Sequence, residues 1–410
     1  MSSKKQKQGY RITYAKAVHG LEELQAVTDV LRQHATAMGP KVEAFEKGVA
    51  QQFGKKFGIM VNSGSSANMV ASRLFALPEG SEIITPALTF STTIAPFIQN
   101  KAVSAFVDAQ EGTYQIDINR IEEMITKKTK ALVIPSLLGN LPDFGALRSI
   151  AKKHNLLFLE DSCDTIGALY KGKPTGTFSD ISTTSFYGSH IITAGGNGGM
   201  ICVNDPAWNR KARVLRGWGR SSSVIQSEAV QDRFRSRIEG KPYDAKFIFE
   251  EVGYNFLPNE MEAAFGVEQL KKLASFKKAR QSNFQTLRAY FTRYEDVFTL
   301  PEELPGTDTA WLAFPLTIRK GAPFSRYDLV AYLEKNGVQT RPVFTGNVLR
   351  HPAFKNVPSK RSKKGYPVAD HVMQNAFLIG CHHGMDEAQL DYLKGLFEKF
   401  LKKKGVRFHA

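Results

Sequence analysis

The sequence is poor in cysteine and has no long apolar run. Its three cysteines, Cys163, Cys202 and Cys381, are odd in number and far apart in 410 residues, which argues against a disulfide framework and fits a reducing compartment. No apolar stretch approaches the ~18 residues that would span a bilayer, so we expect no membrane contact. The start of the chain is polar and lacks the apolar region of an export signal. We therefore expect a cytoplasmic protein.

Basic residues outnumber acidic ones, and the formal net charge is +16. Such an excess can indicate nucleic-acid binding, but no helix-turn-helix, zinc-finger or RNA-binding signature is present. Much of the excess lies near the two ends and in a cluster at residues 360–364. We interpret the charge as a solubilising surface and expect no nucleic-acid partner. Attraction of an anionic small molecule, such as a nucleotide diphosphate, is the functional alternative.

Two hydrophobic periodicities alternate along the chain, whose 42% hydrophobic content suffices for one large or two ordinary domains. Residues 41–53 carry apolar side chains at helical spacing, and residues 67–77 also have a helical pattern, whereas residues 58–61 form a short buried-strand run. Further strand patterns lie at Glu82–Thr85, Val103–Val107, Ala131–Pro135 and Leu156–Glu160. Strands that alternate with helices predict an α/β fold with a mostly parallel sheet flanked by helices.

A long helical pattern at residues 267–294 follows the alternating region. We expect it to link a large domain, residues 1–270, to a smaller α+β C-terminal domain, residues 271–410. Residues 220–250 form the longest irregular stretch, and a loop of this length is usually functional or mobile. In the smaller domain we expect a helix at 325–336 and strands at 310–318 and 338–341.

Small polar residues and carboxylates follow two of the predicted strands. Residues 62–68, NSGSSAN, lie between a strand and a helix, where small side chains let the backbone approach an anion and the helix start supplies N–H donors. A plain capped helix start has the same pattern. Residues 159–164, LEDSCD, end another strand, where sites form in open α/β sheets, and a buried carboxylate there needs a partner.

The segment from Ser185 to Gly199, SFYGSHIITAGGNGG, resembles the cofactor-lysine segment of the sugar aminotransferases that use pyridoxal phosphate (PLP). With the order and spacing of the other motifs, it makes the chain similar to the DegT/DnrJ/StrS family over nearly its whole length. The resemblance implies the PLP-dependent aminotransferase fold type I. It also implies a homodimer whose active sites are shared between subunits.

The family's cofactor-binding positions are filled by suitable residues in this chain. A structural aspartate remains the alternative for each of the two carboxylates among them. The resemblance assigns the cofactor phosphate to Gly64, Ser65 and Ser185 with Ser66 as a further candidate, the pyridine face to Phe90, the protonated ring nitrogen to Asp161, the neighbourhood of the 3-oxygen to Asp164, and the phosphate of the neighbouring subunit's cofactor to Asn255.

Histidine stands where most of the family has the lysine that forms an imine with PLP. His190 cannot form that bond, but an imidazole of ordinary pKa ~6.5 can act as a general base. The branch of the family with histidine here is the 3-dehydratases of nucleotide-linked 4-keto-6-deoxyhexoses. The resemblance therefore implies PLP and its pyridoxamine form (PMP), with glutamate as amine donor. His190 would be the base for loss of the C3 hydroxyl, which gives a 4-keto-3,6-dideoxy sugar.

The chain departs from the members of that branch that carry an iron–sulfur cluster. Such a cluster needs four thiolates. Cys163 matches one ligand position, but the others belong after Trp218–Arg220, where residues 221–226 read SSSVIQ. No cysteine lies between Cys202 and Cys381. We therefore expect neither this cluster nor another metal, and the route without a cluster is favoured.

The nucleotide and the sugar stay open at this stage. Arg220, Arg341, Asn347 and His351 could reach the nucleotide diphosphate or the sugar, and surface or structural roles are open for each. Three other functions also remain: an aminotransferase-like enzyme of another outcome, a radical deoxygenation with an external electron donor, and a catalytically silent PLP-binding paralogue.

Overall fold

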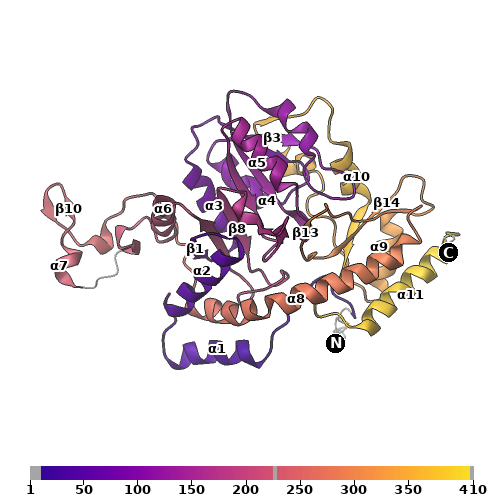
Figure 1. The fold of residues 1–410 in the computed structure, drawn as a ribbon, viewed down its shortest axis with the longest axis horizontal. Helices are drawn as coiled ribbons and strands as arrows, with labels where there is room; N and C mark the ends of the chain where they lie inside the picture. Colours follow the sequence, from indigo (N-terminus) through magenta and orange to yellow (C-terminus); the bar gives the residue numbers. More distant parts are fainter. Residues whose placement is uncertain (1–10, 225–228, 407–410) are drawn as a thin grey trace, which may run out of the picture.

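An eight-stranded sheet forms the centre of the protein in the computed structural model, which describes residues 11–224 and 229–406 (Figure 1). Basic residues 4, 5, 7 and 407 therefore lie outside the described residues. The strand order is β1-β9-β8-β5-β4-β2-β3-β15; β9 is antiparallel to β1 and β8, and the other neighbours are parallel. The expected mostly parallel α/β sheet is confirmed. The strands are β1 (Phe57–Val61), β2 (Glu82–Pro86), β3 (Val103–Val107), β4 (Thr129–Pro135), β5 (Leu157–Asp161), β8 (Ile181–Ser185), β9 (Gly199–Val203) and β15 (Ser359–Lys360).

Both faces of this sheet are covered by helices, which explains the continuous apolar runs of its strands. On β4, Ala131 and Val133 pack toward α3, whereas Leu132 and Ile134 pack toward α5. On β1, Met60 packs toward α2. The helices around the sheet are α2 (Pro40–Gln52), α3 (Gly64–Phe75), α4 (Ser91–Gln99), α5 (Phe144–Lys153) and α6 (Pro206–Arg216).

One continuous helix, α8 (Glu260–Thr292), joins the two parts of the chain (Figure 1). Its first half packs on α1 (Leu21–Arg32) and α2, and its second half carries Phe284 and Phe291 into the core of the C-terminal part. The helix begins earlier than the sequence pattern predicts, because Asn259 caps it at its N-terminus. The expected domain boundary at residue 270 falls inside α8 and stays a prediction.

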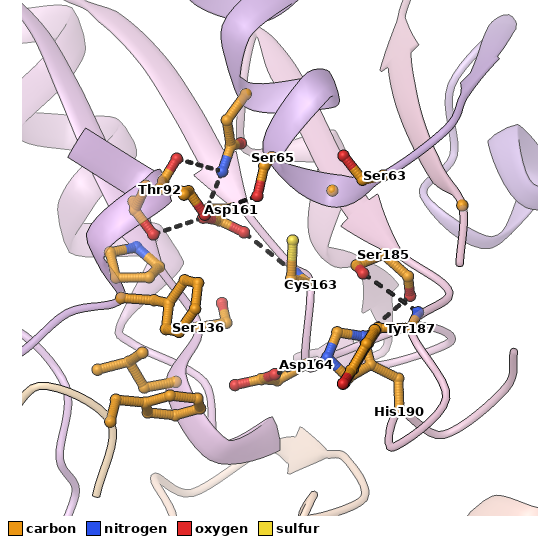
Figure 2. Close-up of a pocket in the computed structure, with 18 of the residues that line it drawn as sticks. Ser63, Ser65, Thr92, Ser136, Asp161, Cys163, Asp164, Ser185, Tyr187 and His190 are labelled. Atoms are coloured by element: carbon orange, nitrogen blue, oxygen red, sulfur yellow. Dashed lines mark hydrogen bonds and ion pairs between the residues drawn. The ribbon is translucent and has the colours of Figure 1, made fainter. Parts of the chain in front are cut away.

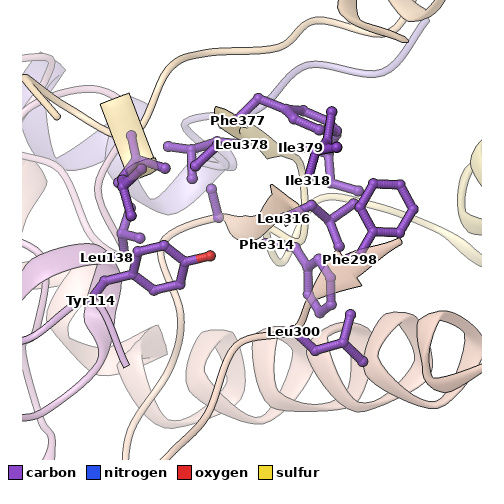
Figure 3. Close-up of a cluster of buried hydrophobic side chains, with 14 of the residues drawn as sticks. Tyr114, Leu138, Phe298, Leu300, Phe314, Leu316, Ile318, Phe377, Leu378 and Ile379 are labelled. Atoms are coloured by element: carbon purple, nitrogen blue, oxygen red, sulfur yellow. The ribbon is translucent and has the colours of Figure 1, made fainter. Parts of the chain in front are cut away.

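The C-terminal part is built on a small antiparallel sheet, β12 (Phe298–Thr299), β14 (Phe314–Ile318) and β16 (Ala376–Ile379). Its large apolar side chains pack together with Tyr114 and Leu138 from the first part of the chain (Figure 3). The Tyr114 hydroxyl also hydrogen-bonds that of Thr317 at 2.8 Å. The helices around this sheet are α9 (Arg326–Lys335), α10 (Pro367–Asn375) and α11 (Glu387–Lys403).

Two expected strands of this part are wrong in extent. Residues 310–313 do not join β14, because the carbonyl oxygens of Trp311 and Leu312 accept hydrogen bonds from Arg280 instead of a neighbouring strand. Residues 338–341 make only isolated bridges at their two ends. Three short strands form a separate sheet in the order β13-β6-β7, namely β6 (Leu169–Tyr170), β7 (Lys173–Pro174) and β13 (Thr307–Asp308).

The described residues of this region, 220–224 and 229–250, leave the body of the molecule as an arm (Figure 1). The expected irregular stretch contains short elements, namely α7 (Val230–Arg233), a hairpin of β10 (Arg237–Ile238) and β11 (Lys241–Pro242), and two 3₁₀ turns. Residues 225–228 lie outside the described residues. The arm exposes the apolar side chains of Val230, Phe234, Ile238, Tyr243, Phe247 and Phe249. In the described part of the chain, no helix is long and apolar enough to span a bilayer.

Replacing two helical glycines by alanine should have opposite effects on stability. A Cβ at Gly266 of α8 would lie 2.6 to 2.9 Å from ring atoms of the buried Phe45. We expect Gly266→Ala to lower the free energy of unfolding by about 1–3 kcal/mol, because the overpacking outweighs the better helix propensity. In α11, a Cβ at Gly395 meets nothing within 4 Å. We therefore expect Gly395→Ala to raise the free energy of unfolding by about 0.5–1 kcal/mol. Urea unfolding of the three proteins measures both shifts; equal shifts would contradict the packing around Phe45.

Candidate active site

A cavity of about 380 Å³ lies at the carboxyl edge of the central sheet (Figure 2). Loops after β1, β2, β4, β5 and β8 line it, and Phe344 from the C-terminal part closes one side. Parallel strands end at the same edge, so five loops that are distant in sequence meet here. The predicted site residues that line this cavity are Gly64, Ser65, Phe90, Asp161, Asp164, Ser185 and His190.

The start of α3 forms a polar concavity in this wall. Ser63 is the N-cap, and its Oγ accepts a hydrogen bond from the backbone N–H of Ser66. A Cβ at Gly64 would lie 2.7 Å from Cβ of Ser185 and 2.8 Å from Sγ of Cys163, so only glycine fits. Ser66 Oγ donates to Asn62, and Ser66 does not line the cavity. The hydroxyls around Gly64 and the N–H groups of the helix start therefore suit an anion.

Asp161 is a buried carboxylate held by hydrogen bonds alone. It ends β5, and its oxygens accept from Asn68 Nδ2 at 2.9 Å, Thr93 Oγ1 at 2.7 Å and the backbone N–H of Cys163 at 3.2 Å. Among the residues that the structure describes, no basic side chain forms an ion pair with it. A buried anion of this kind suits a cationic group of a ligand.

His190 points its Nε2 into the cavity, toward Asp164 (Figure 2). Its Nδ1–H donates to the carbonyl oxygen of Ser185 at 3.2 Å, so in the neutral ring Nε2 carries the lone pair. Nε2 lies 3.8 Å from Oδ1 of Asp164, which is too long for a hydrogen bond. Burial is the main cause that lowers the pKa of His190 to about 4, against the hydrogen bond to Ser185. At neutral pH the ring is therefore uncharged and can accept a proton at Nε2.

Asp164 carries a shifted pKa of its own. Burial first, and then the charge of Asp161, raise the pKa of Asp164 to about 7, although the backbone N–H of Leu138 donates to Oδ2 at 2.9 Å. Both protonation states of this carboxyl are populated near neutral pH. Two titratable groups with displaced pKa values side by side in a cavity are typical of an active site.

Two aromatic rings form the apolar wall of the cavity. Phe90 is 48% exposed, and its ring meets that of Phe344 edge to face with 5.9 Å between centroids. The backbone of Phe344 is in the left-handed region, with φ of 45°, which a large side chain adopts at a cost. The cavity thus offers an aromatic face opposite its polar residues.

The remaining predicted residues do not line this cavity. Asn347 is buried and caps a turn, with Nδ2 donating to Asp370 and Oδ1 accepting from the backbone of Leu349. The ring of His351 donates to a backbone carbonyl, and Arg341 lies exposed over the ring of Tyr14. Substrate contact by these residues stays a prediction.

Arg220 and Asn255 lie at the base of the arm. The Arg220 guanidinium stacks on Trp218 at 4.4 Å and on Phe247 at 5.2 Å. Asn255 is exposed and does not line the cavity of its own chain. Neither placement tests the predicted contacts, which for Asn255 concern a neighbouring subunit. Residues 225 and 226, in the segment that replaces the cluster's cysteines, lie outside the described residues.

Sequence reasoning missed several residues that line or support the cavity. Ser63 and Asn68 belong to the NSGSSAN motif, and a wider use of that motif would have found them. Thr93 follows the predicted Phe90 by three residues, which is one helical turn. Phe344 is brought in from the C-terminal part, and no local pattern indicates its position.

Comparisons with known proteins agree with this geometry. The DegT/DnrJ/EryC1/StrS aminotransferase family matches residues 18–396. The dTDP-4-dehydro-2,6-dideoxy-D-glucose 3-dehydratase of Saccharopolyspora spinosa is 35% identical, over 94% of this chain and 86% of the relative. The GDP-4-keto-6-deoxy-D-mannose 3-dehydratase of Yersinia pseudotuberculosis is 32% identical, over 93% and 96%.

A solved structure extends the comparison to three dimensions. The E. coli GDP-4-keto-6-deoxy-D-mannose-3-dehydratase with bound hydrated PLP superposes with a TM-score of 0.86 and 29% identity, over 95% of this chain and all of that chain. The expected fold class, the PLP-dependent aminotransferase fold type I, is confirmed.

The raised pKa of Asp164 predicts a pH-dependent stability difference. Folding favours the protonated carboxyl, so wild-type stability falls as pH rises from the ordinary value of 3.8 to about 7. Asp164→Asn cannot ionise and should escape this loss. In ligand-free protein, its advantage in free energy of unfolding should grow across that window and then level off, on the order of a few kcal/mol. Urea unfolding at several pH values measures the difference, and parallel curves would contradict the pKa shift.

Proposed function

The chain belongs to the DegT/DnrJ/EryC1/StrS aminotransferase family, and we propose that it is a PLP-dependent 3-dehydratase of a nucleotide-linked 4-keto-6-deoxyhexose. The observation that carries the proposal is His190: its Nε2 faces the cavity, uncharged at neutral pH, at the position where most of the family has lysine. Among the lining residues that the structure describes there is no lysine. The lysine amine that would form an imine with PLP is therefore replaced by an imidazole, which can act as a base but not form that imine.

The cavity fits PLP and PMP by the chemistry of its donors. The concavity at Gly64, with the hydroxyls of Ser65 and Ser185, would hold the phosphate. Asp161, buried and without a basic partner among the described residues, would hold the protonated pyridine nitrogen, and Phe90 would cover the ring. When bound, the cofactor supplies an amine for the sugar ketone and an electron sink.

The residues of the chain would then supply proton transfer. His190 Nε2 would take the proton whose loss drives the departure of the C3 hydroxyl, and the bond from Nδ1 to Ser185 keeps the ring in the required tautomer. Asp164, with its pKa near 7, can give or take a proton beside it. A general base of this kind contributes roughly 10²–10⁴-fold to a rate.

The overall reaction balances without an external reductant. In the net reaction, glutamate is oxidised by two electrons to 2-oxoglutarate and ammonia, which consumes one water. The two electrons and two protons reduce C3 of the sugar from CHOH to CH₂, and the C3 oxygen leaves as water. The chain has three cysteines, fewer than the four thiolates of a cluster. Transamination is the alternative outcome, since the family is described as aminotransferases.

A homodimer with shared sites is part of the proposal. The arm exposes a row of large apolar side chains, and such surfaces mark protein–protein contacts. Asn255 lies exposed at the base of that arm and does not line the cavity of its own chain, which supports the proposed role toward a second subunit.

Mass spectrometry of reaction mixtures tests the reaction and identifies the nucleotide. The purified protein is incubated with PLP, glutamate and CDP-, GDP- or dTDP-linked 4-keto-6-deoxyhexoses, without a reductase. We expect one sugar to lose a single oxygen, with equal amounts of 2-oxoglutarate and ammonia. A product with a new amine would instead establish transamination, and no product with any sugar would contradict the enzyme proposal.

A histidine variant tests the base. We expect His190→Asn to reduce the rate of oxygen loss by roughly 10²–10⁴-fold while PLP absorbance and binding persist. His154→Asn is the matched control, because His154 is a surface residue that pairs with Glu122. Equal rates for His190→Asn and the control would contradict the assigned role, and loss of PLP binding would move His190 to cofactor binding.

A further inference from the structure

A fully buried arginine lies behind the segment that carries His190. Arg280, in the middle of α8, is 0% exposed. Its Nη2 donates to the carbonyl oxygen of His190 at 3.5 Å, and its Nη1 donates to the carbonyls of Trp311 and Leu312 at 3.1 and 2.9 Å. Its Nε donates to Nδ1 of His383 at 3.1 Å. One guanidinium therefore joins the active-site loop, α8 and two segments of the C-terminal part.

The charge of Arg280 is not neutralised by contact. In the parts of the chain that the structure describes, no carboxylate lies within ion-pair distance of it, and its partners are carbonyl oxygens and a histidine ring. Burial lowers the pKa of Arg280 to about 10, so it stays charged at neutral pH. An apolar side chain in this position would avoid the cost of a buried unpaired charge. The charge of Arg280 is therefore free to act on the titratable groups around it.

The titratable groups around Arg280 include both unusual groups of the cavity. Toward the site, burial is the larger cause that lowers the pKa of His190, and the charge of Arg280 lowers it further. Burial raises the pKa of Asp164, and the charge of Arg280 acts to lower it. Toward the C-terminal part, it lowers the pKa of His382 and His383, again after burial.

His190 is also faced by three groups other than Arg280. The carboxyl of Asp164 lies nearest, with Oδ1 3.8 Å from Nε2. Asp161 raises its pKa through its negative charge, which opposes the effect of the guanidinium. The ring of Tyr187 lies 6.0 Å from the imidazole, edge to face. Arg280 is thus the basic residue that acts against charging of His190.

We propose that Arg280 is a positioning residue for the pair of His190 and Asp164. It anchors the turn that carries the imidazole through the carbonyl oxygen of His190, and its charge favours the neutral imidazole and the ionised carboxylate. The role of His190 as a base rests on the proposed function, whereas the effect of Arg280 on its protonation does not.

Histidine NMR of the cofactor-free, full-length protein tests the proposal without any turnover. The chain is labelled with ¹³C at histidine, and the His190 signal is identified by its loss in His190→Asn. We expect it to titrate near 4 in the wild type and in Arg280→Lys, which keeps the charge, and at higher pH in Arg280→Gln, which keeps donors for the carbonyls but loses the charge. Arg280→Met is a second neutral variant in case the glutamine protein does not fold.

A lysine of the same helix gives the matched control. Lys277 is one turn earlier in α8, and its ammonium is paired with Asp308, so Lys277→Met should leave the His190 titration unchanged. A titration that is the same in the wild type and in the neutral Arg280 variants would overturn the proposal. A shift in Arg280→Lys as large as in Arg280→Gln would overturn the role of the charge.

The pH profile of kcat separates this proposal from the proposed function. If His190 is the base, the acidic limb of the profile should move to higher pH in Arg280→Gln and return in Arg280→Lys. A shifted NMR titration in a protein that deoxygenates no sugar would defeat the proposed function and leave Arg280 in its role. An unshifted titration in an active enzyme would defeat the role of Arg280 alone.

Discussion

The parallel alignment of β8, β5, β4, β2 and β3 is the constraint on which the site depends. Because these strands run the same way, and β1 shares their direction through the two antiparallel pairings of β9, their carboxyl ends meet at one edge. The loops after β1, β5 and β8 therefore supply Ser63, Asp161 and His190 to one cavity. Helices cover both faces of the sheet, so this edge is where loops can leave it without disturbing a packed face. The NSGSSAN motif and the carboxylates are distant in sequence and adjacent in space for this reason.

Burial then sets the chemistry of the groups at that edge. The same loss of water lowers the pKa of His190 and raises the pKa of Asp164, because burial favours the uncharged form of each group. Hydrogen bonds decide the remaining details: Ser185 selects the tautomer of the imidazole, and three donors fix the carboxylate of Asp161 in the cavity wall. A lysine in place of His190 would change the chemistry of the cavity more than its shape.

The C-terminal part contributes residues and hydrogen bonds directly to the site. Phe344 supplies one wall, and the carbonyls of Trp311 and Leu312 hold the guanidinium that lies behind His190. These carbonyls also explain why the strand predicted at 310–318 begins only at Phe314, because hydrogen bonds from Arg280 replace those of a sheet at Trp311 and Leu312. The long helix α8 runs through both parts of the chain and carries Arg280, which bonds to segments of each.

Apolar patterns in the sequence were enough to predict β1 to β5, because these strands bury near-continuous apolar runs. The strands β8, β9 and β15 of the same sheet were not predicted; β8, for example, reads ISTTS and has no apolar run. The resemblance of its motifs to the family indicated the seven predicted residues that line the cavity. Three features became visible only in the folded chain: the setting of Asn347, the wall made by Phe344 and the contact between Arg280 and His190. These features join segments that are distant along the chain, so no local pattern of residues could reveal them.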